Sequence, residues 1–110
     1  IVHIDSWSGN VLWEGDQIRA VVDWEEAAYG DPGIDVAYCR MDMILLGMQA
    51  AADEFLQAYE AEMGKPVSNL KLWGLAAAVR PMFSPEGWIS ESPVKERFAQ
   101  FIEQTIASPD

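Results

Sequence analysis

The chain carries near its start the stretch His3-Ile4-Asp5-Ser6-Trp7-Ser8-Gly9-Asn10. Asn10 lies five residues after Asp5, and Asp23 comes later, after two short apolar segments. Phosphoryl transfer needs a carboxylate to orient the attacking hydroxyl group and hard oxygen ligands to hold Mg²⁺ against the phosphates. The spacing of Asp5, Asn10 and Asp23 therefore predicts a metal and phosphate site.

The two apolar segments after this stretch predict a β-hairpin. Residues 11–13 are apolar and β-prone, Gly15-Asp16 marks a turn, and residues 18–24 resume an apolar run. A hairpin returns the chain to its starting end, so we expect Asn10 and Asp23 to lie at the same end of the two strands. We expect residues 1–3 to end a strand and residues 4–9 to form a loop.

The rest of the chain has the patterns of helices. Asp31 and Pro32 are typical of a helix start, and Pro81 predicts a helix end. Apolar residues recur at helical spacing in four segments, which are 34–46, 49–63, 68–79 and 92–107. We expect residues 82–92 to be irregular. The sequence thus predicts a mostly helical α+β fold, a hairpin followed by about four helices, as a single domain over residues 1–110.

Composition restricts the partners. The chain has 110 residues, half of them hydrophobic, and a formal charge of −11. Such a charge repels nucleic acid and anionic lipid, and no tract of 18 apolar residues would span a membrane. Solubility explains the charge, but a cationic small-molecule substrate would also suit it. The single cysteine excludes an intrachain disulfide and favours a cytoplasmic location.

Three linked motifs resemble the C-terminal lobe of the aminoglycoside phosphotransferase family, which has a protein-kinase-like fold. They are residues 3–13, residues 22–25 with Asp23, and residues 30–32 followed by Asp35. The resemblance implies an ATP-dependent kinase of a small hydroxylated molecule. It also implies that Asp5 is the catalytic base, and that Asn10 and Asp23 bind Mg²⁺. The acceptor could be an aminoglycoside, another sugar or a small alcohol.

Other residues near these motifs have supporting roles or remain open. We expect His3 to brace the loop, and Asp35 to accept N–H bonds from it. Asp31 either shares this scaffold role or only caps a helix. Trp7 is a candidate substrate contact, and the acidic pair at residues 25–26 is explained by solvation.

One residue departs from the family pattern. The family usually has Gly between the His and the Asp, whereas this chain has Ile4. We expect its branched side chain to exclude a positive φ and so to alter the loop.

The sequence also lacks parts that a kinase needs. No glycine-rich phosphate cover and no Lys for the α- and β-phosphates are present. We therefore expect a fragment without its N-terminal lobe, inactive alone and prone to self-association through an exposed apolar face. The alternative is a non-catalytic binding or regulatory module with the same fold. A metal-dependent hydrolase is less favoured, because no second base or His cluster is present to activate water.

Overall fold

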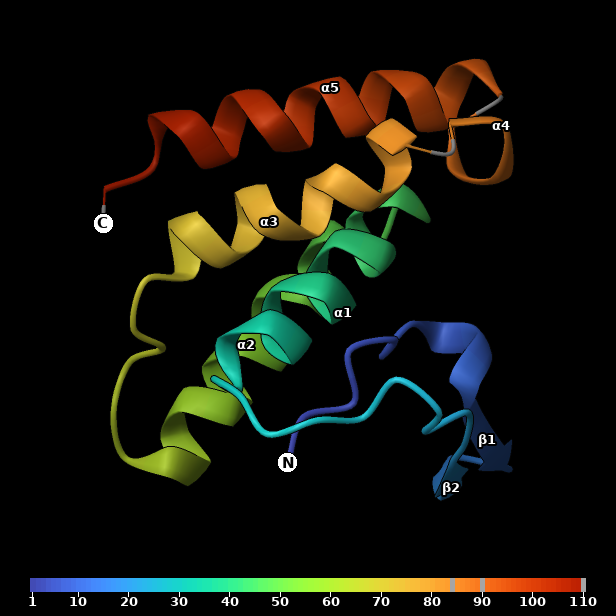
Figure 1. The fold of residues 1–110 in the computed structure, drawn as a ribbon, viewed down its shortest axis with the longest axis vertical. Helices are drawn as coiled ribbons and strands as arrows, with labels where there is room; N and C mark the ends of the chain where they lie inside the picture. Colours follow the sequence, from blue (N-terminus) through green and yellow to red (C-terminus); the bar gives the residue numbers. More distant parts are fainter. Residues whose placement is uncertain (84, 90, 110) are drawn as a thin grey trace.

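The computed structural model describes residues 1–83, 85–89 and 91–109. Its elements in order are η1 (Ser8–Asn10), β1 (Val11–Glu14), β2 (Gln17–Val21), α1 (Gly33–Leu45), α2 (Gln49–Met63), α3 (Leu70–Phe83), α4 (Pro85–Trp88) and α5 (Ser92–Ala107). A small hairpin therefore precedes a set of helices, which confirms the expected mostly helical α+β architecture. Figure 1 shows the hairpin to one side of the helices, with α3 and α5 running alongside each other.

The hairpin is antiparallel, and Val11 lies opposite Val21. Its turn is made by Gly15 and Asp16, and Gly15 has a positive φ of 63° that suits a tight turn. The second strand ends at Val21 rather than at Trp24, so it is shorter than predicted. Asp23 turns into the left-handed region at φ 65°, and the Trp24 indole N–H donates to the Val21 carbonyl at 2.7 Å. These two features direct the chain out of the strand.

The start of the chain also differs from the prediction. Residues 1–3 contribute only an isolated bridge, in which Val2 pairs with Ala28. The end of the predicted loop forms the 3-10 turn η1, which leads directly into β1.

The hydrophobic core is built around α1, which contacts α2, α3 and α5. Tyr38 and Met41 are fully buried at its centre. The other buried members of this cluster are Ala37, Ile44, Leu45, Ala52, Ala77, Ala78, Phe98 and Phe101. Their recurrence at helical spacing explains why these segments form helices, because each has one apolar face to cover.

Two expectations about the C-terminal half were wrong. Pro81 does not end its helix, since α3 continues to Phe83. The proline removes one helical hydrogen bond near the end of the helix, and its ring is fully buried. Part of the segment expected to be irregular forms the short helix α4, which begins at Pro85, where a missing N–H costs nothing. Ser84 and Ser90, in the same segment, lie outside the described residues.

Among the described helices, none combines the length and the apolar character needed to cross a bilayer.

Candidate functional site

The loop that carries Asp5 is fastened to the first turn of α1. The Asp35 carboxylate accepts the backbone N–H of His3 at 2.7 Å and that of Ile4 at 2.8 Å. The Ser6 hydroxyl donates to the Asp35 carbonyl at 3.2 Å. A charged acceptor that binds two consecutive N–H groups fixes the path of the backbone.

Ile4 adopts a conformation that we expected its side chain to exclude. Its φ is 73°, in the left-handed region, which costs a non-glycine residue about 1–3 kcal/mol. The Asp35 carboxylate accepts the N–H of Ile4, and His3 Nδ1 accepts the N–H of Asp5, so the peptide groups on both sides of Ile4 are held. The expectation was wrong because β-branching makes this region costly without forbidding it, and the surrounding contacts stabilise it.

His3 lies beneath the loop and is only 3% exposed. Its Nδ1 accepts the backbone N–H of Asp5 at 3.1 Å, so this ring nitrogen carries no proton. Nε2 then carries the proton and donates to the Val22 carbonyl at 2.7 Å. One neutral imidazole thus connects the loop to the residue that follows β2.

Asn10 closes the loop from the other side. Its Nδ2 donates to the backbone carbonyl of Asp5 at 2.8 Å and to Asp5 Oδ2 at 3.2 Å. The side chain is buried, at 7% exposed. Because the amide nitrogen faces Asp5, the amide oxygen is the atom left to bind a cation.

The other carboxylate oxygen of Asp5 has partners from two helices. The Tyr38 hydroxyl of α1 donates to Oδ1 at 3.3 Å, and Arg80 Nη1 of α3 donates to it at 3.2 Å. Arg80 also pairs with Glu26 at 3.4 Å, and its guanidinium lies 4.9 Å from the centre of the Tyr38 ring. An ionised carboxylate has about four lone-pair positions. Asn10, Tyr38 and Arg80 occupy three of them.

The electrostatics of this cluster keep Tyr38 protonated and Arg80 charged. Burial raises the pKa of Tyr38 to about 12, so its hydroxyl stays protonated as a donor. Burial lowers the pKa of Arg80. The hydrogen bond and charge of Tyr38, together with the charges of Glu26 and Asp5, raise it by more. Its net pKa is above the ordinary value, so the guanidinium stays charged.

Asp23 lies at the same end of the hairpin as Asn10. The Val22 N–H donates to the Asn10 carbonyl at 2.8 Å, and Asp23 is the next residue, exposed to solvent. Carboxylate and amide oxygens form the kind of donor set that Mg²⁺ binds with water and phosphate as the other ligands. In the part of the chain that the structure describes, no group of three or more His, Cys, Asp or Glu residues could hold a metal.

The remaining predicted residues lie near this cluster in different settings. Asp31 accepts the N–H of Gly33 at 2.8 Å, so it caps the start of α1. Trp7 is 40% exposed, and its ring packs against the backbone of Gly9. Glu26 is exposed but pairs with Arg80, so solvation alone does not describe it.

Sequence reasoning missed three residues of the cluster. Tyr38 and Asp42 follow Asp35 by three and seven positions, so the three share one face of α1. Asp42 is buried and accepts the N–H of Ser8 at 2.9 Å. Three polar residues on one face of an otherwise apolar helix could have been recognised from the sequence as candidates for the site. Arg80 gave a weaker signal, as a cation within the apolar helix α3.

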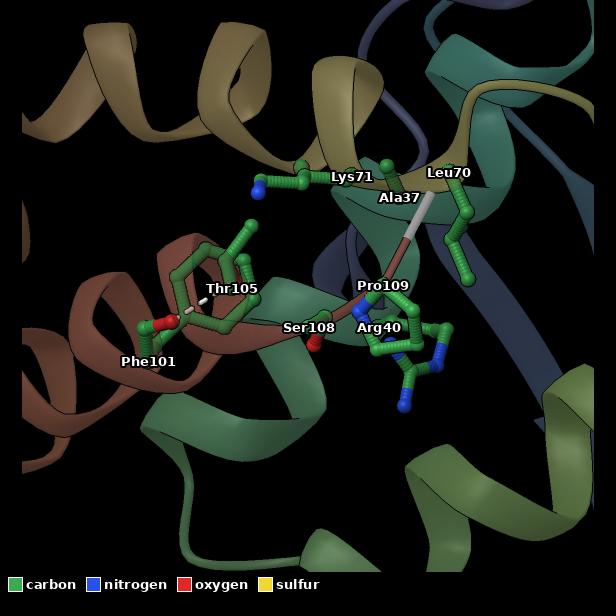
Figure 2. A pocket seen from close by; sticks show the side chains of 9 residues that line it. Ala37, Arg40, Leu70, Lys71, Phe101, Thr105, Ser108 and Pro109 are labelled. Carbon is green, nitrogen blue, oxygen red and sulfur yellow. Dashed lines mark hydrogen bonds between the residues drawn. The ribbon is translucent and has the colours of Figure 1, made fainter.

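A separate hollow of about 90 Å³ lies between α1, α3 and α5, and Arg40, Lys71 and Phe101 are part of its lining (Figure 2). The Arg40 guanidinium is bound to Asp53 at 3.0 Å. None of residues 3–23 lines this hollow, so it is distinct from the site around Asp5.

Two known kinases are similar to parts of this chain. The chain is 49% identical over 37 residues to hygromycin-B 4-O-kinase of Escherichia coli. This alignment covers 34% of this chain and 11% of that protein. It is 26% identical over 84 residues to 4-hydroxytryptamine kinase of Psilocybe cyanescens, covering 64% of this chain and 23% of that protein. The chain thus spans less than a quarter of either relative's length. No solved structure matched it.

The model of one protein family, described as the phosphotransferase enzyme family, matches residues 1–69. This match includes the Asp5 loop, the hairpin, α1 and α2, which is more than half of the chain. The chain therefore belongs to the phosphotransferase enzyme family, whose members include kinases of small molecules.

Proposed function

We propose that this chain is part of an ATP-dependent kinase that transfers the γ-phosphoryl group to a hydroxyl of an aminoglycoside, another sugar or a small alcohol. The observation that carries the proposal is the environment of the Asp5 carboxylate. Three side chains from separate elements hold it, and about one lone-pair position is left for an acceptor hydroxyl.

Asp5 is the residue that orients the acceptor. Its carboxylate accepts the hydroxyl proton and directs the oxygen toward the phosphorus, while the bond from phosphorus to the leaving nucleotide oxygen breaks. In a loose transition state positioning contributes more than strong deprotonation, so Asp5 needs no unusual basicity. The His3 and Asp35 contacts keep the loop in place for this step.

Asn10 and Asp23 are the residues that would hold Mg²⁺. The Asn10 amide oxygen and the Asp23 carboxylate supply hard oxygen ligands at the same end of the hairpin. When bound, the ion neutralises charge on the phosphates.

We also propose that residues 1–110 form one domain of a longer enzyme whose N-terminal lobe binds the nucleotide. The support is that the chain spans 11% and 23% of the two relatives. Leu12, Trp13 and Ile18 of the hairpin are 49–59% exposed, which suits contact with another lobe or self-association of the isolated piece. The net charge of −11 favours a cationic acceptor.

The test is ADP release by the full-length protein with ATP, Mg²⁺ and a panel of amino sugars, other sugars and small alcohols. We expect turnover that depends on one acceptor class. Asp5→Asn should lower kcat by about 10²–10⁴-fold, and Asp23→Ala should abolish the response to Mg²⁺.

The matched control is Asp16→Asn, which removes a carboxylate from the exposed hairpin turn and should leave turnover unchanged. If Asp5→Asn matched the wild type, Asp5 would not be the base. A wild-type protein that binds no Mg²⁺-nucleotide would instead favour the non-catalytic module.

A further inference from the structure

We propose that Arg80 is a positioning residue for Asp5, which fixes the carboxylate in the orientation that the acceptor hydroxyl requires. The inference rests on the proposed kinase function and adds a residue from α3, beyond the part of the chain that the family model matches. The path from residue 5 to residue 80 is long in sequence, so this contact exists only in the folded protein.

The contacts of Arg80 show how it would act. One guanidinium nitrogen binds Asp5 Oδ1 at 3.2 Å, and a second binds Glu26 at 3.4 Å. The central carbon of the same group, Cζ, lies over the Tyr38 ring, 4.9 Å from its centroid. Two ionic contacts and one aromatic contact restrict the rotation of the guanidinium, so a restrained cation holds the carboxylate.

The two oxygens of Asp5 are also held from different directions. Asn10 of η1 binds Oδ2, while Tyr38 of α1 and Arg80 of α3 bind Oδ1. Rotation of the carboxylate about its Cβ–Cγ bond would break contacts at both oxygens. A displacement of about 1 Å at a reacting group can cost 10²-fold in rate, so the restraint matters for catalysis.

The burial of this cluster makes its ion pair stronger than a surface pair. The side chains of Arg80 and Asp5 are 32% and 22% exposed. Partial removal of water strengthens the attraction, and it still leaves Asp5 accessible to a small acceptor. Lysine would not replace the arginine fully, because a single ammonium group lacks the planar fork with which Arg80 reaches two carboxylates.

The first experiment measures steady-state kinetics of the full-length enzyme with an acceptor that the panel has identified. Arg80→Met should lower kcat by about 10–100-fold, with the KM for ATP changed by less than about twofold. Arg80→Lys should restore part of the loss. A kcat for Arg80→Met equal to or above that of the wild type would overturn the inference.

Arg40→Met is the matched control. Arg40 makes an ion pair of the same kind with Asp53, also from a helix, but away from the Asp5 loop. Its kcat should remain within about twofold of the wild type. An equal loss of kcat in the Arg40 and Arg80 variants would point to general destabilisation and would also overturn the inference.

A second measurement does not depend on activity and separates this inference from the proposed function. In a double-mutant cycle of Arg80→Met with Asp5→Ala, the unfolding constant of the double variant should depart from the product of the single effects by at least about threefold. The cycle of Arg40→Met with Asp5→Ala should show no departure. Absent coupling between positions 80 and 5 would overturn the inference even if the enzyme has no identified acceptor. Turnover that is lost in Asp5→Asn but intact in Arg80→Met would remove the role of Arg80 and keep the kinase function.

Discussion

Two regions of this molecule are held together by different forces. We call residues 1–31 the loop and hairpin region, and residues 33–107 the helical body. Among the described residues, every buried hydrophobic side chain except Val2 belongs to the helical body. The loop and hairpin region instead depends on polar contacts to Asp35, Asp42 and Arg80. Apolar burial therefore stabilises the scaffold, and directed hydrogen bonds set the shape of the site.

The difference follows from what each region has to do. Apolar contacts are non-directional, so the helical body tolerates changes that conserve volume. Hydrogen bonds to charged acceptors depend on angle and distance, which is what a reacting carboxylate such as Asp5 requires. The four predictions below probe this comparison, from the largest expected effect to the smallest.

The largest effect is expected in the core of the helical body. Met41→Ala should lower the free energy of unfolding by about 2–5 kcal/mol, because Met41 is completely buried among three other helices and its removal leaves a cavity. Trp13→Ala, in the hairpin, should have an effect below about 1 kcal/mol, since Trp13 is 59% exposed. Urea denaturation of the full-length protein measures both. An effect of Trp13→Ala as large as that of Met41→Ala would contradict the conclusion that apolar burial stabilises mainly the helical body.

The next effect is expected at the contact between the two regions. Asp35→Ala should cost about 2–4 kcal/mol, because the N–H groups of His3 and Ile4 lose a charged acceptor. Asp31→Ala is the control, since it removes a carboxylate that caps one N–H and should cost about 1 kcal/mol. The same unfolding measurement compares them. Equal costs for the two variants would mean that Asp35 does not hold the loop.

A smaller effect is expected from the strained residue in the loop. Ile4→Gly should be more stable than Ile4→Ala by about 1 kcal/mol, because glycine tolerates a φ of 73° and alanine does not. This order is the reverse of what is usual in regular structure, where alanine is favoured. Thermal unfolding of the two variants tests it. Greater stability of Ile4→Ala would show that the residue does not occupy the left-handed region.

The smallest effect concerns Cys39 on α1, where the two regions meet. Burial, with the charges of Asp42 and Asp35, raises the pKa of this thiol from 9.0 to about 11. Alkylation by iodoacetamide requires the thiolate, so the rate at Cys39 should rise with a midpoint near pH 11. The protonated thiol is the form that folding favours. Its contribution to stability is therefore complete below pH 9 and is lost as the pH rises through about 11.

Mass spectrometry of the peptide that contains Cys39 follows this reaction. The matched variant Cys39→Ala should lack the loss of stability between these pH values. A midpoint near pH 9 would mean that water reaches the thiol freely.

Much of the fold could be predicted because it depends on short-range pattern. The hairpin follows from two apolar segments around Gly15 and Asp16, and α1, α2 and α5 follow from apolar residues at helical spacing. Errors arose where tertiary contacts opposed a local rule. Pro81 stays inside α3 in a buried position, and Ile4 keeps a positive φ that Asp35 supports.

The sequence alone determined which residues are candidates for chemistry, because Asp5, Asn10 and Asp23 are linked by a short loop and one hairpin. Their roles as base and metal ligands stay predictions. Only the tertiary structure decided what surrounds Asp5, since Tyr38 and Arg80 are 33 and 75 residues away along the chain. The physical reason is that spacing within one helix or hairpin fixes local geometry. Which side chains of separate helices meet is set by how those helices pack around a shared core.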